Sequence, residues 1–268
     1  MKKDAIKTKH VYSEKKQNIV YLKKNNEKWY PINFQWIPVV QLNNELNIKT
    51  MKNLVILPLI FLLISISSCS DDDLIIGSGN PISEFRSVAN FSKISAEGVF
   101  DITITQGSMQ SVEIIADDNI IHKVKTKVVS NELRLYLDDD NNYRGIILEV
   151  NIIVPSINSV KNSGVGNITI LDVDTIDNFN VYNSGSGDIS IEGSAKSLTI
   201  KNEGSGDIEG FQFAVDECNV EIEGSGDVEI SCSDKLNIKI DGSGSVYYKG
   251  NPTIDADING SGQVVNDD

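Results

Sequence analysis

The sequence predicts an all-β fold, a right-handed parallel β-helix (a β-solenoid) with coils of about 19 residues. The first observation behind this prediction is a Gly-x-Gly pair that recurs every 18 to 21 residues. The second is an apolar β-branched residue four positions after each first glycine, and the third is another apolar alternation before each pair. The first glycines are Gly164, Gly185, Gly204, Gly224, Gly242 and Gly260, and four positions later stand Ile168, Ile189, Ile208, Val228, Val246 and Val264.

The alternations on both sides of each pair predict two strands per repeat, joined by turns in which the glycines supply positive φ. One repeat buries about five apolar side chains, each worth roughly 1.5–3 kcal/mol. Ordering its backbone costs on the order of 1–2 kcal/mol per residue, so a single coil is unstable alone. Stacking coils about 4.8 Å apart pairs each strand with its neighbours and makes the core continuous. The right-handed sense is the usual one for β-crossovers.

Residues 51–68 have the layout of a lipoprotein signal peptide. Lys52 precedes an apolar run of 13 residues, which is short for a membrane-spanning helix. Ile66-Ser67-Ser68-Cys69 then resembles the lipobox at which bacterial lipoprotein precursors are cut. We expect Cys69 to be the lipid-attachment residue, with ordinary secretion or an uncleaved anchor as alternatives. Residues 1–50 have no clear secretory role, and we expect a misassigned start upstream of Met51 and a disordered or weakly structured segment.

Residues 69–76 are expected to be an acidic tether. Ser70 at the second position is compatible with sorting to the outer membrane, and Asp71-Asp72-Asp73 resembles a surface-export signal of some Gram-negative lipoproteins. We expect the protein on the cell surface, with the periplasmic face of the outer membrane as the alternative. The expected contact with the membrane is the lipid anchor.

Residues 77–268 are expected to form a single solenoid domain, irregular over 77–160 and built of regular Gly-x-Gly coils over 161–268. A solenoid needs capped ends to avoid pairing with other chains, and the irregular part can supply one cap. Strands are predicted there at 98–107, 112–116, 132–137 and 146–154, with an exposed polar loop at 138–142.

Equivalent positions of the regular coils are expected to stack. Asn162, Asn183 and Asn202 share one offset and are predicted to form a structural ladder of amides that bond from coil to coil. Cys218 falls in a core column and is expected to be a buried thiol. Cys232 falls in a predicted turn, and a disulfide between the two cysteines is the alternative.

Several motifs together resemble a known family. Gly77-Ser78-Gly79-Asn80 opens the region, Phe91-Ser92-Lys93-Ile94 and Gly98-Val99-Phe100-Asp101-Ile102 follow, and Gly-Ser-Gly-Asp recurs at 185–188, 204–207 and 224–227. Most of residues 77–265 thereby resembles the head GIN domain of auto-transporter adhesins. The resemblance implies an all-β solenoid of secreted or lipid-anchored bacterial proteins and no particular ligand. The sequence departs from an auto-transporter because no membrane barrel follows the repeats, so attachment is expected at Cys69.

The charge of the expected mature region excludes some partners. From Cys69 onward, 13 Lys and Arg stand against 34 Asp and Glu, a formal charge of −21. Such a surface repels phosphate backbones, which argues against a nucleic-acid partner. The sequence contains no P-loop, dinucleotide fingerprint, nucleophile elbow or CxxC pair, and His122 is the one histidine after Cys69. We therefore expect no catalytic residue, no cofactor and no metal site.

The strongest chemical candidate is the column Asp188, Asp207 and Asp227, each three residues past a first glycine. Adjacent carboxylates stacked about 4.8 Å apart repel by roughly 1 kcal/mol in water. Turn capping is the favoured role. Calcium binding between turns and acid–base catalysis on glycans are the alternatives.

Three functions remain open at this point. The favoured one is a surface adhesin or ligand-binding module for an extracellular polymer or protein. The alternatives are a β-helix enzyme acting on glycans and an architectural envelope protein. Enzymes that cleave acidic polysaccharides generally need a basic groove, whereas the arginines of the expected mature region, Arg86, Arg134 and Arg144, precede the regular coils. This favours a binding module.

Overall fold

The computed structural model describes residues 8–11, 20–25, 28–31, 74–138 and 141–268. The chain divides into two units, Met1–Ser68 and Cys69–Asp268. In the first, β1 (Thr8–Val11), β2 (Val20–Asn25) and β3 (Lys28–Pro31) form an antiparallel sheet. This sheet lies in the segment 1–50, for which the sequence predicts little stable structure. The expected signal peptide, residues 51–68, lies outside the described residues.

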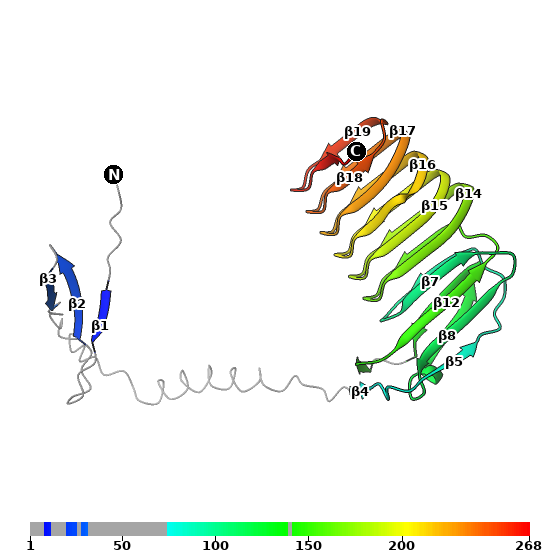
Figure 1. The fold of residues 1–268 in the computed structure, drawn as a ribbon, viewed down its shortest axis with the longest axis horizontal. Helices are drawn as coiled ribbons and strands as arrows, with labels where there is room; N and C mark the ends of the chain where they lie inside the picture. Colours follow the sequence, from blue (N-terminus) through cyan, green and yellow to red (C-terminus); the bar gives the residue numbers. More distant parts are fainter. Residues whose placement is uncertain (1–7, 12–19, 26–27, 32–73, 139–140) are drawn as a thin grey trace, which may run out of the picture. The chain divides into compact units, whose positions relative to one another are not determined.

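The second unit is a β-solenoid of stacked parallel coils (Figure 1). Its regular coils are β14 (Ile168–Asn183), β15 (Ile189–Asn202), β16 (Ile208–Ile222) and β17 (Val228–Ile240). The prediction of two strands per repeat is wrong for these coils, because each is one continuous bent strand. Register shifts lie in the middle of each pairing, and Asp172 and Gly193 adopt positive φ there. The chain thus turns the corner through bulges instead of a loop.

Each coil contributes to two parallel strips of strand. We call strip A the segments that follow the glycine pairs: β7 (Asp101–Gln106), the first halves of β14–β17, β18 (Val246–Lys249) and β20 (Val264–Asn266). Strip B comprises the segments that precede them: β6 (Lys93–Ala96), β13 (Ser159–Asn162), the second halves of β14–β17, and β19 (Thr253–Ile258).

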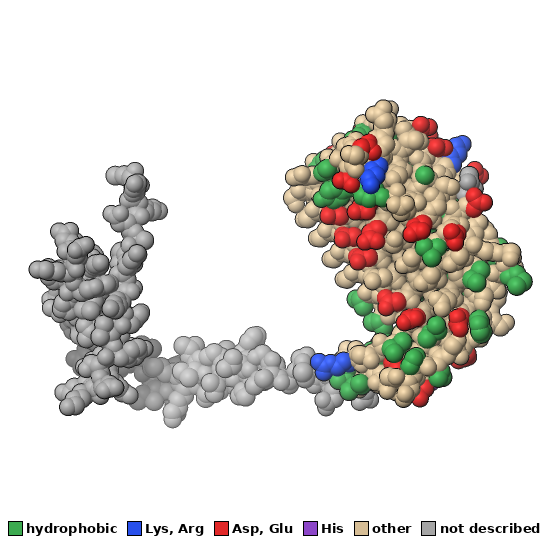
Figure 2. Space-filling view, in the orientation of Figure 1, with side chains coloured by type: hydrophobic (Ala, Val, Ile, Leu, Met, Phe, Trp, Pro, Cys, Tyr) green, Lys and Arg blue, Asp and Glu red, His purple; other side chains and the backbone are tan. Residues whose placement is uncertain are grey.

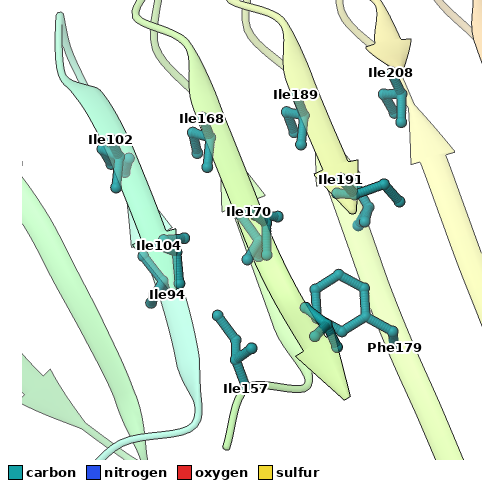
Figure 3. Close-up of a cluster of buried hydrophobic side chains, with 14 of the residues drawn as sticks. Ile94, Ile102, Ile104, Ile157, Ile168, Ile170, Phe179, Ile189, Ile191 and Ile208 are labelled. Carbon is teal, nitrogen blue, oxygen red and sulfur yellow. The ribbon is translucent and has the colours of Figure 1, made fainter. Parts of the chain in front are cut away.

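The predicted core columns are confirmed. Ile168, Ile189, Ile208 and Val228 are register partners on successive coils and are at most 1% exposed. Figure 3 shows the first three in one file, which Ile102 of β7 extends. On strip B, Cys218 pairs with Leu198 and Leu236 as expected and is fully buried.

An insertion separates the first coil from the regular ones. β8 (Ser111–Asp117), the 3-10 helix η1 (Ile121–Lys123), β9 (Val124–Val129), β10 (Glu132–Leu137) and β12 (Leu148–Val154) lie between β7 and β13. β10 pairs in parallel with β6, and β12 with β7, so the two form an additional rung. The antiparallel strands β9, β8 and β5 (Pro81–Phe85) close this end. β11 (Asn142–Arg144) pairs with β4 (Leu74–Ile76).

Glycine is required at the paired positions for a different reason from the one expected. None of the twelve glycines in the six pairs has positive φ. A Cβ on Gly185 would instead lie 1.9 Å from the carbonyl oxygen of Gly164, and one on Gly187 would lie 2.0 Å from that of Gly166. Glycine is therefore required because the turns of adjacent coils touch through their backbones.

The predicted asparagine ladder is confirmed, and its coil-to-coil partners are backbone groups of the glycine turns. Asn183 is fully buried, its Oδ1 accepts a hydrogen bond from the backbone N–H of Gly185, and its Nδ2 donates to the carbonyls of Gly187 and Gly206. Asn162 and Asn202 repeat this pattern. The amides therefore join coils through the glycine turns, and not through each other.

Candidate functional site

The predicted aspartate column lies on the outer face of strip A and acts on the backbone. Oδ1 of Asp188 accepts a hydrogen bond from the backbone N–H of Asp207 at 2.8 Å, and Oδ1 of Asp207 accepts one from Asp227 at 2.7 Å. Asp227 accepts from the backbone N–H of Ser245 in the same way. One oxygen of each carboxylate therefore caps the start of the next strand, which is the structural role that the sequence favours. Across the described residues, no group of three or more His, Cys, Asp or Glu side chains is placed to hold a metal ion.

Acidic side chains nevertheless dominate this face, and Figure 2 shows them gathered over the stacked coils. A pocket of about 310 Å³ lies among Asp207, Glu209, Asp227, Glu229 and neighbouring residues. Desolvation by burial raises the pKa of Glu229, and the negative charge of Glu209 raises it further. Strip A thus presents a face that disfavours anions.

The outer face of strip B carries a different pattern, and β10 and β9 continue this face beyond β6. The strand registers place nine side chains in one row across nine successive strands. We call this the cation row, because from β10 onward a basic residue recurs on every second strand. In order, the row is Lys127, Arg134, Ser95, Lys161, Tyr182, Lys201, Glu221, Lys239 and Asp257.

In the far half of the cation row, from Lys201 to Asp257, the lysines form ion pairs with carboxylates of the protein. Nζ of Lys201 lies 2.8 Å from Glu203 and 3.0 Å from Glu223. Nζ of Lys239 lies 2.7 Å from Asp241 and 3.0 Å from Glu221. Hydrogen bonds to these carboxylates raise the pKa of both lysines and, reciprocally, the lysines lower the pKa of Glu203 and Asp241. These ammonium groups are already neutralised by the protein.

The near half of the cation row opens into a pocket of about 540 Å³. We call it the strip B pocket; it is lined by Ser95, Glu97, Lys127, Val129, Glu132, Arg134, Leu135, Tyr136, Lys161 and Ser163. Nε of Arg134 lies 2.7 Å from Glu132, and Nζ of Lys161 lies 4.9 Å from the centre of the Tyr182 ring. Among the described residues, neither Lys127 nor Lys161 forms an ion pair.

The strip B pocket could not be found from the sequence. Its cations come from β9, β10 and β13; the insertion sets β10 and β9 on one side of β6, and β13 lies on the other side. Lys161 follows Val160 of a predicted core column, and the strand alternation therefore places it on the outer face. Arg134 alternates with Leu133 and Leu135 in the predicted strand 132–137, which also places it on an outer face, but no repeat relates it or Lys127 to Lys161.

The other residues considered in the sequence analysis are the three cysteines and His122. Cys69 lies outside the described residues. Cys218 and Cys232 are both free and buried, so the alternative disulfide is absent, and burial raises the pKa of each thiol. The prediction that Cys232 lies in a turn is wrong. Cys232 lies within β17 and pairs with Val215 of β16, and its Sγ donates a hydrogen bond to the carbonyl of Lys235. His122 is exposed in η1.

Within the described part of the chain, no helix combines the length and the apolar character that crossing a bilayer requires.

Comparisons with known proteins place these features in context. The family described as "Putative auto-transporter adhesin, head GIN domain" matches residues 90–252. A crystal structure of a "putative adhesin" from Bacteroides fragilis has a TM-score of 0.62 and 26% identity, covering 72% of this chain and 99% of that one. A "putative adhesin" from Parabacteroides merdae has a TM-score of 0.45 and 22% identity, covering 73% and 100%. No curated protein matches the chain.

Proposed function

Because the chain belongs to the head GIN domain family of auto-transporter adhesins, we propose that it is a lipid-anchored surface adhesin without catalytic activity. Cys69 would carry the lipid, and the solenoid would bind an extracellular polymer or protein. The expected location is the outer surface of the outer membrane, with its periplasmic face as the alternative.

The outer face of strip B carries this proposal. Stacked coils hold side chains in rows at the strand spacing of about 4.8 Å, so a ligand meets a rigid, repeating surface. The near half of the cation row, with Lys127, Arg134, Ser95 and Lys161, offers charged and hydroxyl groups at fixed positions. Rigid presentation lowers the entropy lost on binding, which favours an extended ligand.

The absence of catalysis is supported by the use of the acidic side chains. A general acid or base needs a carboxyl group free to exchange a proton with a substrate. The carboxylates of Asp188, Asp207 and Asp227 instead accept hydrogen bonds from the backbone of the next coil. Movement of such a carboxylate would leave the backbone N–H of the next coil without its cap.

Anchoring is tested by labelling cells with a clickable fatty acid. We expect the wild-type protein to take up the label and Cys69→Ala to lose it. Cys218→Ala is the matched control, because it removes a cysteine from the solenoid core and should keep the label. Equal labelling of Cys69→Ala and wild type would exclude lipid attachment at this residue.

Surface exposure and adhesion are tested on the same cells. Protease added to intact cells should degrade the wild-type protein, whereas protection until the outer membrane is opened would place it on the periplasmic face. Cells with the protein should adhere to a host matrix or to glycan-coated surfaces better than a deletion strain. Equal adhesion would contradict the adhesin function, and release of oligosaccharides from a glycan panel would contradict the absence of catalysis.

A further inference from the structure

We propose that the strip B pocket is an anion-binding site for the carboxylate or sulfate group of an acidic extracellular polysaccharide. This inference rests on the proposed function, since it names the ligand class of the adhesin. Lys127, Arg134 and Lys161 are the residues that would contact the acidic group.

The local charge of the pocket differs from that of the unit around it. The region from Cys69 onward has a formal charge of −21, yet the pocket holds three cations against Glu97 and Glu132. Glu132 is already engaged by Arg134 at 2.7 Å. At physiological ionic strength the Debye length is about 8 Å, so exposed acids farther away are largely screened. An anion in the pocket therefore experiences mainly the charges of the pocket itself, where three cations outnumber two carboxylates.

The two lysines of the pocket are available to a ligand, and the other two lysines of the row are not. Lys127 and Lys161 are exposed and, among the described residues, form no ion pair. Lys201 and Lys239 each contact at least two carboxylates within 3.0 Å. An added anion would compete with those carboxylates, which makes the near end of the row the preferred site.

The other groups of the pocket suit a sugar. Ser95, Ser163 and Tyr136 line it with hydroxyl groups, which both donate and accept hydrogen bonds. A volume of about 540 Å³ falls within the range of roughly 300–1,000 Å³ usual for small-ligand sites. Lys161 lies against the Tyr182 ring, which holds its stem at the rim of the pocket. The hydroxyl groups of the pocket can bond to sugar hydroxyls, while the neighbouring cations can contact an acidic group of the same ligand.

The test uses the protein purified from membranes in detergent and calorimetric titration with three probes. These are a heparin hexasaccharide, a hyaluronan hexasaccharide, which carries carboxylates without sulfate, and the neutral maltohexaose. We expect binding of an acidic probe, weaker at high salt, and none of maltohexaose. Hyaluronan binding would assign the site to carboxylates, and binding of heparin alone would assign it to sulfates. Failure of both acidic probes, or equal binding of maltohexaose, would overturn the proposal.

Variants locate the site. The double variant Lys127→Gln/Lys161→Gln should bind the acidic probe at least about tenfold more weakly, because charge-assisted hydrogen bonds are lost. Lys239→Gln is the matched control from the same row and should bind like wild type. Both pocket lysines are exposed, so thermal melting should confirm that the double variant is folded. An equal loss in Lys239→Gln would indicate nonspecific attraction and overturn the proposal.

Failure of this inference can be distinguished from failure of the proposed function. Adhesion of whole cells is measured in parallel for wild type, the deletion strain and the double variant. If wild-type cells adhere and the double variant adheres equally well, the pocket is not the site, while the adhesin function stands. If wild-type cells adhere no better than the deletion strain, the adhesin function fails.

Discussion

The central coils and the last coil of the solenoid share one sequence pattern and differ in burial. Leu236 and Ile240 of β17 are fully buried, whereas their register partners Ile254 and Ile258 of β19 are 39% and 43% exposed. The pattern therefore specifies where a residue points within its coil. Burial depends in addition on a neighbouring coil on each side, and the described chain provides none beyond β19 and β20. Equivalent substitutions in the two regions should reveal this difference.

The largest effect is expected at the glycine turns. A Cβ on Gly204 would lie 2.0 Å from the carbonyl oxygen of Gly185, and a further coil packs on its other side. Gly204→Val should cost more than about 4 kcal/mol or prevent folding, because its turn cannot move away from Gly185 without displacing the coil on its other side. Gly260→Val should cost much less, since only the last coil has to move. Urea unfolding measures both, and equal costs would contradict the comparison.

The next effect concerns the core columns. Leu236→Ala should lower the free energy of unfolding by about 3 kcal/mol, because a fully buried side chain is replaced by a cavity. Ile254→Ala, its partner in the last coil, should cost less than about 1.5 kcal/mol, since part of that side chain already meets water. Similar values in chemical denaturation would mean that the last coil is covered in solution.

The core columns and most of the turn glycines could be predicted from the sequence. The core column that contains Ile168 and the burial of Cys218 follow from the sequence repeat, because a fixed offset from a glycine pair gives a fixed position in the coil. Gly98 was missed as a member of the turn column, although Gly164 packs directly on it. The two are 66 residues apart in sequence, and Phe100 stands where the second glycine is expected.

The strip B pocket was missed for a related reason. Lys127 and Arg134 belong to the insertion, whose strands pair with coils that are distant in sequence. No repeat relates them to Lys161, so their proximity depends on tertiary pairing alone. The prediction of positive φ at the glycine pairs was wrong because sequence pattern does not distinguish a backbone conformation from a close approach of two backbones.

A smaller effect is expected for the buried amides. Asn183→Ala would leave the N–H of Gly185 and the carbonyls of Gly187 and Gly206 without their side-chain partner, at a cost of about 2 kcal/mol. Asn259→Ala in the last coil should change stability little, because its bonds to Asp241 and Asp257 are exposed. Thermal melting of the two variants provides the comparison, and a larger loss in Asn259→Ala would reverse it.

The smallest effect is expected for the ion pairs of the cation row. Lys239→Gln should lower the melting temperature only slightly at pH 7, since exposed ion pairs contribute little. Lys239 lowers the pKa of Asp241, so the stabilisation it provides is present above the unfolded pKa and lost as pH falls through the folded pKa. Melting temperatures measured from pH 6 to pH 3 should fall slightly more in wild type than in Lys239→Gln. A steeper fall in the variant would contradict this.

The position of the first coil has a consequence for the order of assembly. β6 lies between β10 and β13, and β7 lies between β12 and β14. All four flanking strands are made after β6 and β7. A growing polypeptide cannot therefore fix its earliest strands as they emerge, and must wait until β14 exists. From β15 onward, by contrast, each newly made turn settles on one already in place, so the remainder can form in the order of translation.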